Sequence, residues 1–143
     1  MSGAGAVPAI AVINSNQDTT EMLREVLQHH GFSAVVIGHV TEIKRGHIDF
    51  LRFVATHDPR VFVWDIGIPY EENWRFVQLL MDGEQMQGRR FVLTTTNKRA
   101  LDQLVGATNT IEIIGKPYDL DLVVVAVKKA AGVSPTAEKA EAE

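Results

Sequence analysis

Five short runs of mostly β-branched apolar residues alternate along this chain with longer segments of helical periodicity, and this alternation constrains the fold most. Most of the runs are continuously apolar, without the alternating polarity of a strand that has one wet face, so we expect strands covered on both faces. Strands that alternate with helices predict an α/β fold, an open parallel sheet with helices on both sides. The predicted strands are residues 8–13, 33–37, 61–64, 91–93 and 110–114.

The segments between the runs carry start and stop signals of helices. The clearest helix begins near Asp18, which stands three residues before Glu21 as in a capping box, and ends at Gly31. Weaker helical patterns cover residues 46–57, 72–81 and 98–105. Each of the first four predicted strands is therefore followed by a predicted helix.

The segment 120–127 is compatible with two structures. Its four valines favour a sixth strand on propensity alone. Asp119 and Asp121 at its start, and the lysine pair that follows it, complement the dipole of a helix instead. We predict a helix, which completes five strand–helix units.

Composition excludes several classes of protein. The 143 residues suit one domain, placed at residues 8–133, and the lack of cysteine excludes disulfides and thiolate zinc sites. Residues 134–143 contain three Glu, one Lys and no large apolar side chain, so we expect a disordered acidic tail that holds half of the formal charge of −4. Basic residues form isolated pairs and no block, which argues against nucleic-acid binding.

The sequence also favours neither a membrane protein nor a histidine metal site. The longest apolar run, residues 6–13, is too short to span a bilayer, and no charged segment precedes it as in a secretory signal. The five histidines lack metal-ligand spacing, and Trp64 and Trp74 are expected to be packing residues. We therefore expect a cytoplasmic protein without contact with membranes.

Polar residues follow four of the predicted strands directly. Asn14 and Ser15 follow the first strand, Asp65 the third, Thr94 the fourth and Lys116 the fifth. Because ligands of such sheets bind beyond the carboxyl ends of the strands, we expect these side chains to meet in one crevice. An aspartate can attack a phosphoryl group, a lysine can offset the charge on its oxygens, and a hydroxyl can donate to one of them.

Three stretches of the chain resemble receiver domains of two-component response regulators. They are residues 61–69, which end a strand in Asp65 with Pro69 four residues later; residues 91–95; and residues 106–107 followed by 113–117 with a Lys-Pro turn. The resemblance extends over about residues 10–131. It implies a flavodoxin-like, doubly wound (βα)₅ parallel sheet with strand order 2-1-3-4-5.

The resemblance also implies a function. Asp65 would accept a phosphoryl group from a sensor histidine kinase or a histidine phosphotransfer protein, and Thr94 and Lys116 would sense it. A face formed by the fourth helix, fifth strand and fifth helix would dock a partner protein, and a homodimer is compatible with it. The chain would be no enzyme beyond weak autophosphorylation from small phosphodonors and autodephosphorylation. We expect a single-domain receiver, with a cis bond at Lys116-Pro117.

The chain departs from the receiver pattern where the family has two adjacent acids that hold Mg²⁺. Asn14 and Ser15 stand there, so Asp65 is left with the Gly67 carbonyl and neutral oxygens, and we expect a weakened Mg²⁺ site. Asp18, or one of the acids at residues 71–72, could supply a further carboxylate ligand to the Mg²⁺ site. Asp18 is better explained as a helix cap. Where many receivers carry an aromatic switch residue, this chain has Ile113.

Alternatives to the phosphoacceptor remain. A pseudo-receiver would use the same fold as a phosphorylation-independent protein-interaction module, and Asp65 would then be only a turn-forming acid. A flavin or nucleotide module is disfavoured because residues 14–20 contain no glycine and Asp18 would repel a phosphate. Hydrolysis is disfavoured because no serine, histidine and acid fall together at strand ends.

Overall fold

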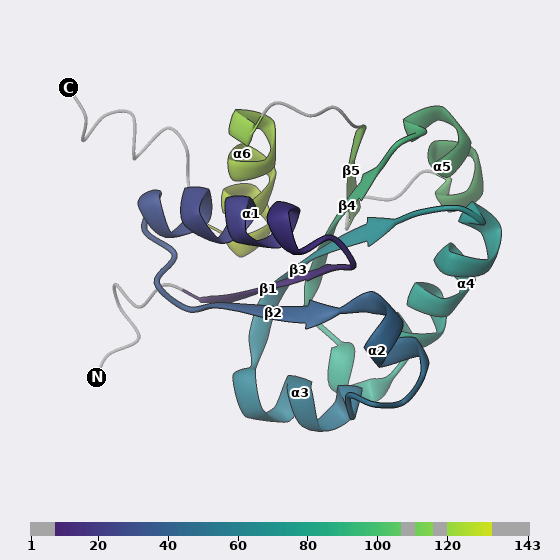
Figure 1. Ribbon diagram of the computed structural model, residues 1–143, viewed down its shortest axis with the longest axis horizontal. Helices are drawn as coiled ribbons and strands as arrows, with labels where there is room; N and C mark the ends of the chain where they lie inside the picture. The colour runs from purple at the N-terminus through teal and green to yellow at the C-terminus, as the bar shows by residue number, and fades with distance from the viewer. Residues whose placement is uncertain (1–7, 107–110, 116–119, 133–143) are drawn as a thin grey trace.

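A computed structural model describes residues 8–106, 111–115 and 120–132, and within them five parallel strands form one sheet in the order β2-β1-β3-β4-β5 (Figure 1). The predicted doubly wound sheet and its strand order are confirmed. The strands are β1 Ala9–Asn14, β2 Val35–His39, β3 Pro59–Ile66, β4 Arg90–Thr95 and β5 Ile111–Gly115. The tail predicted at residues 134–143 lies outside the described residues.

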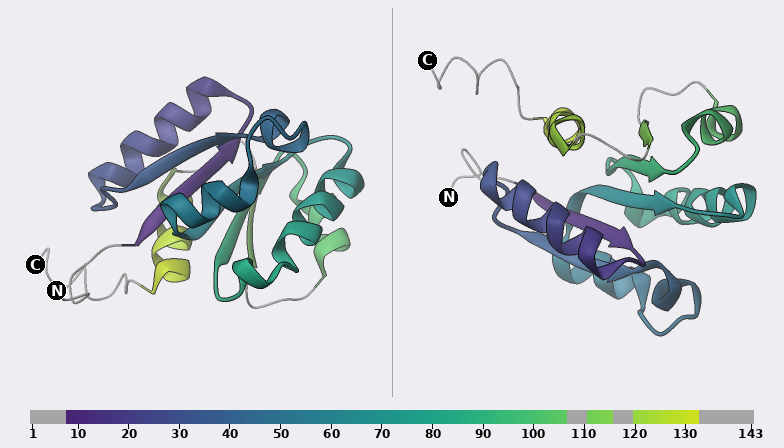
Figure 2. Two further views of the ribbon diagram at one scale, coloured as in Figure 1. Left: turned by 90° about the horizontal axis from the view of Figure 1, so that it is seen from below. Right: turned by 45° about the horizontal axis from the view of Figure 1, so that its top comes forward.

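Helices cover both faces of the sheet. The described residues form helices α1 Gln17–His29, α2 Val40–Lys44, α3 Phe50–His57, α4 Tyr70–Met81, α5 Lys98–Val105 and α6 Leu120–Ala131, and the 3₁₀ helix η1 Glu84–Met86. Helices α1 and α6 pack on one face, whereas α2, α3, α4 and α5 pack on the other (Figures 1 and 2). None of these helices combines the length and the apolar composition that crossing a bilayer requires.

The continuous apolar runs are explained by this double cover. Along β1, Ile10 and Val12 pack into the layer of α1 and α6, and Ala11 and Ile13 pack into the opposite layer. All four side chains are fully buried, so none of these four positions presents a side chain to solvent. The two tryptophans predicted to be packing residues are also buried, with 1% of Trp64 and 7% of Trp74 exposed.

The predicted cap of the first helix is wrong by two residues, although the helix begins near the predicted place. The N-cap is Asn16, whose side chain accepts a hydrogen bond from the Thr19 amide at 2.9 Å. Asp18 is not the cap but an exposed residue of the first turn. Its negative charge there interacts favourably with the positive end of the helix dipole. Both residue types are strong caps, and the side chain that reaches the orphan amide decides between them.

The second predicted helix is shorter than expected, and an additional short helix precedes it. Residues 46–57 were expected as one helix, but α3 begins at Phe50, where Asp49 caps it by accepting from the Arg52 amide at 3.2 Å. The short helix α2 ends at Lys44 and was not predicted, because five residues are too few to display a periodicity. The predictions of helix at residues 98–105 and after residue 120 are confirmed by α5 and α6.

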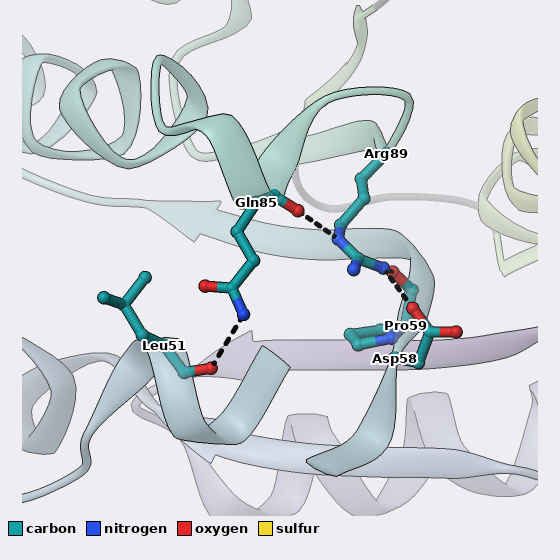
Figure 3. Close-up of polar contacts among 5 residues, drawn as sticks. All are labelled: Leu51, Asp58, Pro59, Gln85 and Arg89. Carbon is teal, nitrogen blue, oxygen red and sulfur yellow. Dashed lines mark hydrogen bonds and ion pairs between the residues drawn. The ribbon is translucent and has the colours of Figure 1, made fainter. Parts of the chain in front are cut away.

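Arg89 ties together three segments at the amino-terminal edge of the sheet (Figure 3). Its Nη1 donates to the Asp58 carboxylate and to the Pro59 carbonyl, both at 2.8 Å, and its Nε donates to the Gln85 carbonyl at 3.0 Å. Asp58 ends α3 in the left-handed conformation, with φ 47°. The Arg89 side chain is only 16% exposed, whereas Asp58 is 80% exposed, so the ion pair is open to solvent and the bond to the Pro59 carbonyl is the part-buried one.

Replacing Arg89 with alanine is expected to lower the free energy of unfolding by about 1–3 kcal/mol, because the part-buried Pro59 carbonyl loses a charged donor. Chemical denaturation followed by circular dichroism measures the change. Arg60→Ala is the matched control, because Arg60 is an exposed arginine at the same amino-terminal edge of the sheet. Equal losses in the two variants would mean that the Arg89 contacts do not stabilise the fold.

Candidate functional site

The carboxyl ends of the parallel strands meet along one edge of the sheet (Figure 2). There Asp65, near the end of β3, stands in register with Thr94, near the end of β4. Asn14 ends β1, the strand on the other side of β3. The sheet therefore brings three of the predicted site residues to one edge.

Asp65 and Thr94 are in direct contact. Thr94 is fully buried, and its hydroxyl donates a hydrogen bond to Oδ1 of Asp65 at 2.9 Å. Asp65 itself is only partly buried, because it stands where the strand leaves the core. One carboxylate oxygen is thus fixed by a buried donor, and the carboxylate remains accessible from the cavity described next.

An open cavity of about 240 Å³ lies beside Asp65. Its polar and aromatic lining includes Ser15, Lys44, Asp65, Gly67, Asn73 and Phe76. The lining residues come from the loop after β1, from α2, from the end of β3 and from α4. Among the described residues that line it, Asp65 is the one acid and Lys44 the one base.

Asn14 does not line this cavity, although it was predicted with Ser15 as part of the site. Only 3% of Asn14 is exposed, and its Oδ1 accepts a hydrogen bond from the Asn16 amide at 2.9 Å. The side chain therefore helps to hold the turn that leads into α1. Ser15, which is exposed, does line the cavity.

The residues do not fit a firmly held Mg²⁺ ion. Within the described parts of the chain, no three His, Cys, Asp or Glu side chains gather as a metal site would require. The other side-chain oxygens of the cavity lining are the hydroxyls of Ser15 and Thr41 and the amide oxygen of Asn73, all of them neutral. The Gly67 carbonyl accepts from Nδ2 of Asn73 at 2.9 Å. Mg²⁺ demands near-octahedral oxygen ligation and is usually held by carboxylates, so this donor set is poor for it.

The three acids considered as additional Mg²⁺ ligands do not line the cavity. Asp18, Glu71 and Glu72 are not among the lining residues. Glu71 pairs with Arg75 at 3.0 Å along α4, and Glu72 lies 3.8 Å from the Lys44 ammonium. A second anionic ligand from these positions is therefore not part of the described cavity.

Residues that the sequence did not single out complete the surroundings. Lys44 and Asn73 meet across the cavity, where Nζ of Lys44 donates to Oδ1 of Asn73 at 2.7 Å. Near the same sheet edge, the hydroxyls of Tyr70 and Thr96 are hydrogen-bonded at 2.7 Å. Lys44 and Asn73 are 29 residues apart, so no local sequence pattern predicts their contact. It follows from the packing of α2 beside α4.

Some predicted features lie outside the described residues. Lys116 and the bond between Lys116 and Pro117 belong to them. A cis peptide bond is present within the described part at Ile68-Pro69, in the loop after β3. Ile113, at the position of the aromatic switch, packs partly buried against the layer of α2 to α5.

Solved structures resemble this fold, although no family model and no curated protein matches the sequence. The signal receiver domain of a two-component histidine kinase from Clostridium thermocellum aligns with TM-score 0.69 and 12% identity, over 88% of this chain and 98% of that one. The chemotaxis response regulator CheY4 of Vibrio cholerae aligns with TM-score 0.66 and 16% identity, over 87% and 99%.

A CheY-like receiver domain from Methylobacillus flagellatus aligns with TM-score 0.62 and 16% identity, over 87% of this chain and 99% of that one. In each case the likeness extends over almost the whole of the other chain and most of this one. At such identities the likeness establishes architecture. This chain has the fold of the receiver domains of response regulators.

Proposed function

We propose that this chain is a receiver in a His-to-Asp phosphorelay, with Asp65 as the phosphoacceptor. The observation that carries the proposal is the position of Asp65. It lies at the carboxyl end of β3, accepts the Thr94 hydroxyl at 2.9 Å and borders an open cavity of about 240 Å³. A fixed carboxylate at the edge of a cavity is suited to attack an incoming phosphoryl group.

The proposed reaction is a phosphoryl transfer from a phosphohistidine. A carboxylate oxygen of Asp65 forms a bond to phosphorus while the bond from phosphorus to the donor's imidazole nitrogen breaks. The electron pair of the broken bond stays on that nitrogen. Thr94 would then donate to a phosphoryl oxygen instead of to the carboxylate, and Lys116 would offset its charge, as the resemblance implies.

The proposed donor is a sensor histidine kinase or a histidine phosphotransfer protein in the cytoplasm. The proposed output is docking of a partner protein, or of a second copy, on the face of α5, β5 and α6. Those helices carry the exposed apolar side chains Leu104, Leu122 and Val125. Catalysis is limited in this proposal to slow self-phosphorylation from small donors and loss of the phosphoryl group.

Incubation with acetyl phosphate or phosphoramidate in the presence of Mg²⁺, followed by intact-mass measurement, tests the proposal. We expect one added phosphoryl group on the native chain and none on Asp65→Asn. The matched control is Asp82→Asn, because Asp82 is an exposed aspartate at the end of α4. Absence of the added mass, or its survival in Asp65→Asn, would falsify the proposed acceptor.

One observation favours a second function. Receiver chemistry uses Mg²⁺, and the cavity beside Asp65 offers one carboxylate among its described lining residues. A pseudo-receiver, which binds a partner regardless of phosphorylation, would need no metal. It is supported if no donor modifies Asp65 while capture of a partner is equal for the native chain and Asp65→Asn.

A further inference from the structure

A lysine lies in the cavity where a receiver of the usual pattern would hold a metal ion. Lys44 ends α2 and lines the same cavity as Asp65. Its side chain is 32% exposed, and its ammonium group is hydrogen-bonded to Asn73, which also lines the cavity. The cavity therefore contains a fixed positive charge that belongs to the chain itself.

The ammonium group of Lys44 is held by α4. Nζ donates to Oδ1 of Asn73 at 2.7 Å, and Nδ2 of Asn73 donates to the Gly67 carbonyl at 2.9 Å. Nζ also lies 3.8 Å from a carboxylate oxygen of Glu72 and 5.8 Å from the centre of the Phe76 ring. These contacts connect the lysine to the loop that follows Asp65.

The charge of Lys44 is only partly offset by these partners. Asn73 is neutral, and Glu72 is 71% exposed and beyond hydrogen-bond distance, so solvent screens it. An ammonium group has three N–H donors, and the bond to Asn73 uses one of them. The remaining donors suit the oxygens of a phosphoryl group that enters the cavity.

The same contacts disfavour a divalent cation. The Gly67 carbonyl, a metal ligand by the resemblance, already accepts from Asn73. Oδ1 of Asp65 accepts from Thr94 and Oδ1 of Asn14 accepts from Asn16. A metal ion would share these oxygens with their hydrogen-bond donors, and it would stand in one cavity with the positive charge of Lys44, which repels it.

We propose that Lys44, the cation among the described residues that line the acceptor cavity, takes the place of Mg²⁺. It offsets the charge of the phosphoryl group during transfer to Asp65, so that uptake does not require a divalent ion. Asn73 is the positioning residue, because it holds the ammonium group beside the loop after β3. This inference rests on the proposed function of Asp65.

The rate of phosphoryl uptake from phosphoramidate, with a chelator or with millimolar Mg²⁺, tests this role. We expect the native chain to react equally in both media, within about twofold, and Lys44→Met to be slower by at least about tenfold in the medium with the chelator. Lys44→Arg keeps the charge and is expected to retain most of the rate. Lys129→Met is the matched control, because Lys129 is an exposed lysine of α6 that pairs with Glu112.

A native rate that requires Mg²⁺, or a rate unchanged in Lys44→Met, overturns the role of Lys44 while the acceptor role of Asp65 stands. A Lys44→Met rate that Mg²⁺ restores supports it, because the metal then replaces the lost charge. Asn73→Ala is expected to slow uptake less than Lys44→Met, since the charge remains but is no longer held.

A second measurement does not depend on phosphorylation. Calorimetric titration with Mg²⁺ is expected to show tighter binding to Ser15→Asp/Lys44→Met than to Ser15→Asp, by about tenfold, because the repelling charge has been removed. If no donor phosphorylates the chain, the proposed function fails and this titration still decides whether Lys44 opposes a metal. Equal affinities of the two variants overturn that part.

Discussion

Replacing Ser15 with aspartate is expected to raise the affinity for Mg²⁺ by at least about a hundredfold over the native chain. Ser15 lines the cavity that Asp65 borders, so the new carboxylate would share this space with the existing one. Opposite charges at about 4 Å attract by about 4 kcal/mol per unit charge near a protein surface, and only part of this is lost to desolvation. A net gain of about 2.7 kcal/mol corresponds to a hundredfold.

The gain in Mg²⁺ affinity is expected to depend on which residue carries the new carboxylate. Asn14→Asp is expected to give a smaller gain, because residue 14 does not line the cavity and its oxygen accepts from the Asn16 amide. Ser15→Asn is the uncharged control and is expected to bind as weakly as the native chain. Tryptophan emission during a Mg²⁺ titration measures all of these, since Trp64 also lines the cavity.

The double variant Asn14→Asp/Ser15→Asp restores the acidic pair that receivers carry, and we expect it to bind at least as tightly as Ser15→Asp. Native affinity that already equals that of the double variant would contradict the argument from the missing carboxylates. A larger gain from Asn14→Asp than from Ser15→Asp would show that the side chain of residue 14 turns toward the metal when it is charged.

Truncation of Phe62 to alanine is expected to lower the free energy of unfolding by about 3–5 kcal/mol. Phe62 is fully buried at the centre of β3 and stacks on Phe91, with ring centres 5.1 Å apart. Its ring also lies against Phe50, at 5.8 Å, and Trp64, at 6.3 Å. The loss combines the removed apolar surface with a cavity that neighbouring rings cannot fill.

Urea denaturation monitored by tryptophan emission measures this loss. Leu51→Ala is the control, because Leu51 is a large apolar side chain of α3 that is 60% exposed, and it is expected to change stability by less than about 0.5 kcal/mol. Phe62→Leu keeps most of the side-chain volume, and its loss of stability is expected to lie between those of Phe62→Ala and Leu51→Ala. A loss in Phe62→Ala no larger than that in Leu51→Ala would mean that the aromatic contacts contribute little.

The architecture was predictable because the central strands β1, β3 and β4 are buried on both faces. Burial of every side chain from Ile10 to Ile13 requires an apolar run, and such runs are visible without knowledge of any contact. The strand boundaries were less predictable. β3 begins at Pro59 and β2 at Val35, whereas the sequence predicted residues 61 and 33, because strand ends depend on the neighbouring strand.

The sequence predicts those residues of the site that stand at the ends of strands. Thr94 meets Asp65 because their strands are neighbours and in register, a consequence of the topology alone. Lys44 was not predictable, because α2 gives no periodicity and its partner Asn73 lies on α4. The failure of Asn14 to line the cavity was equally hidden, since it depends on one turn hydrogen bond.

The two packed layers differ in their aromatic content. The ring contacts among Phe50, Phe53, Phe62, Trp64, Phe76 and Phe91 all lie in the layer of α2 to α5. Among the described residues, the opposite layer consists almost wholly of aliphatic side chains, with Phe32 as its buried ring. Near-ultraviolet dichroism and ring-current shifts in proton spectra therefore report mainly on the layer that carries the cavity, so ligand binding there has a built-in optical and magnetic signature.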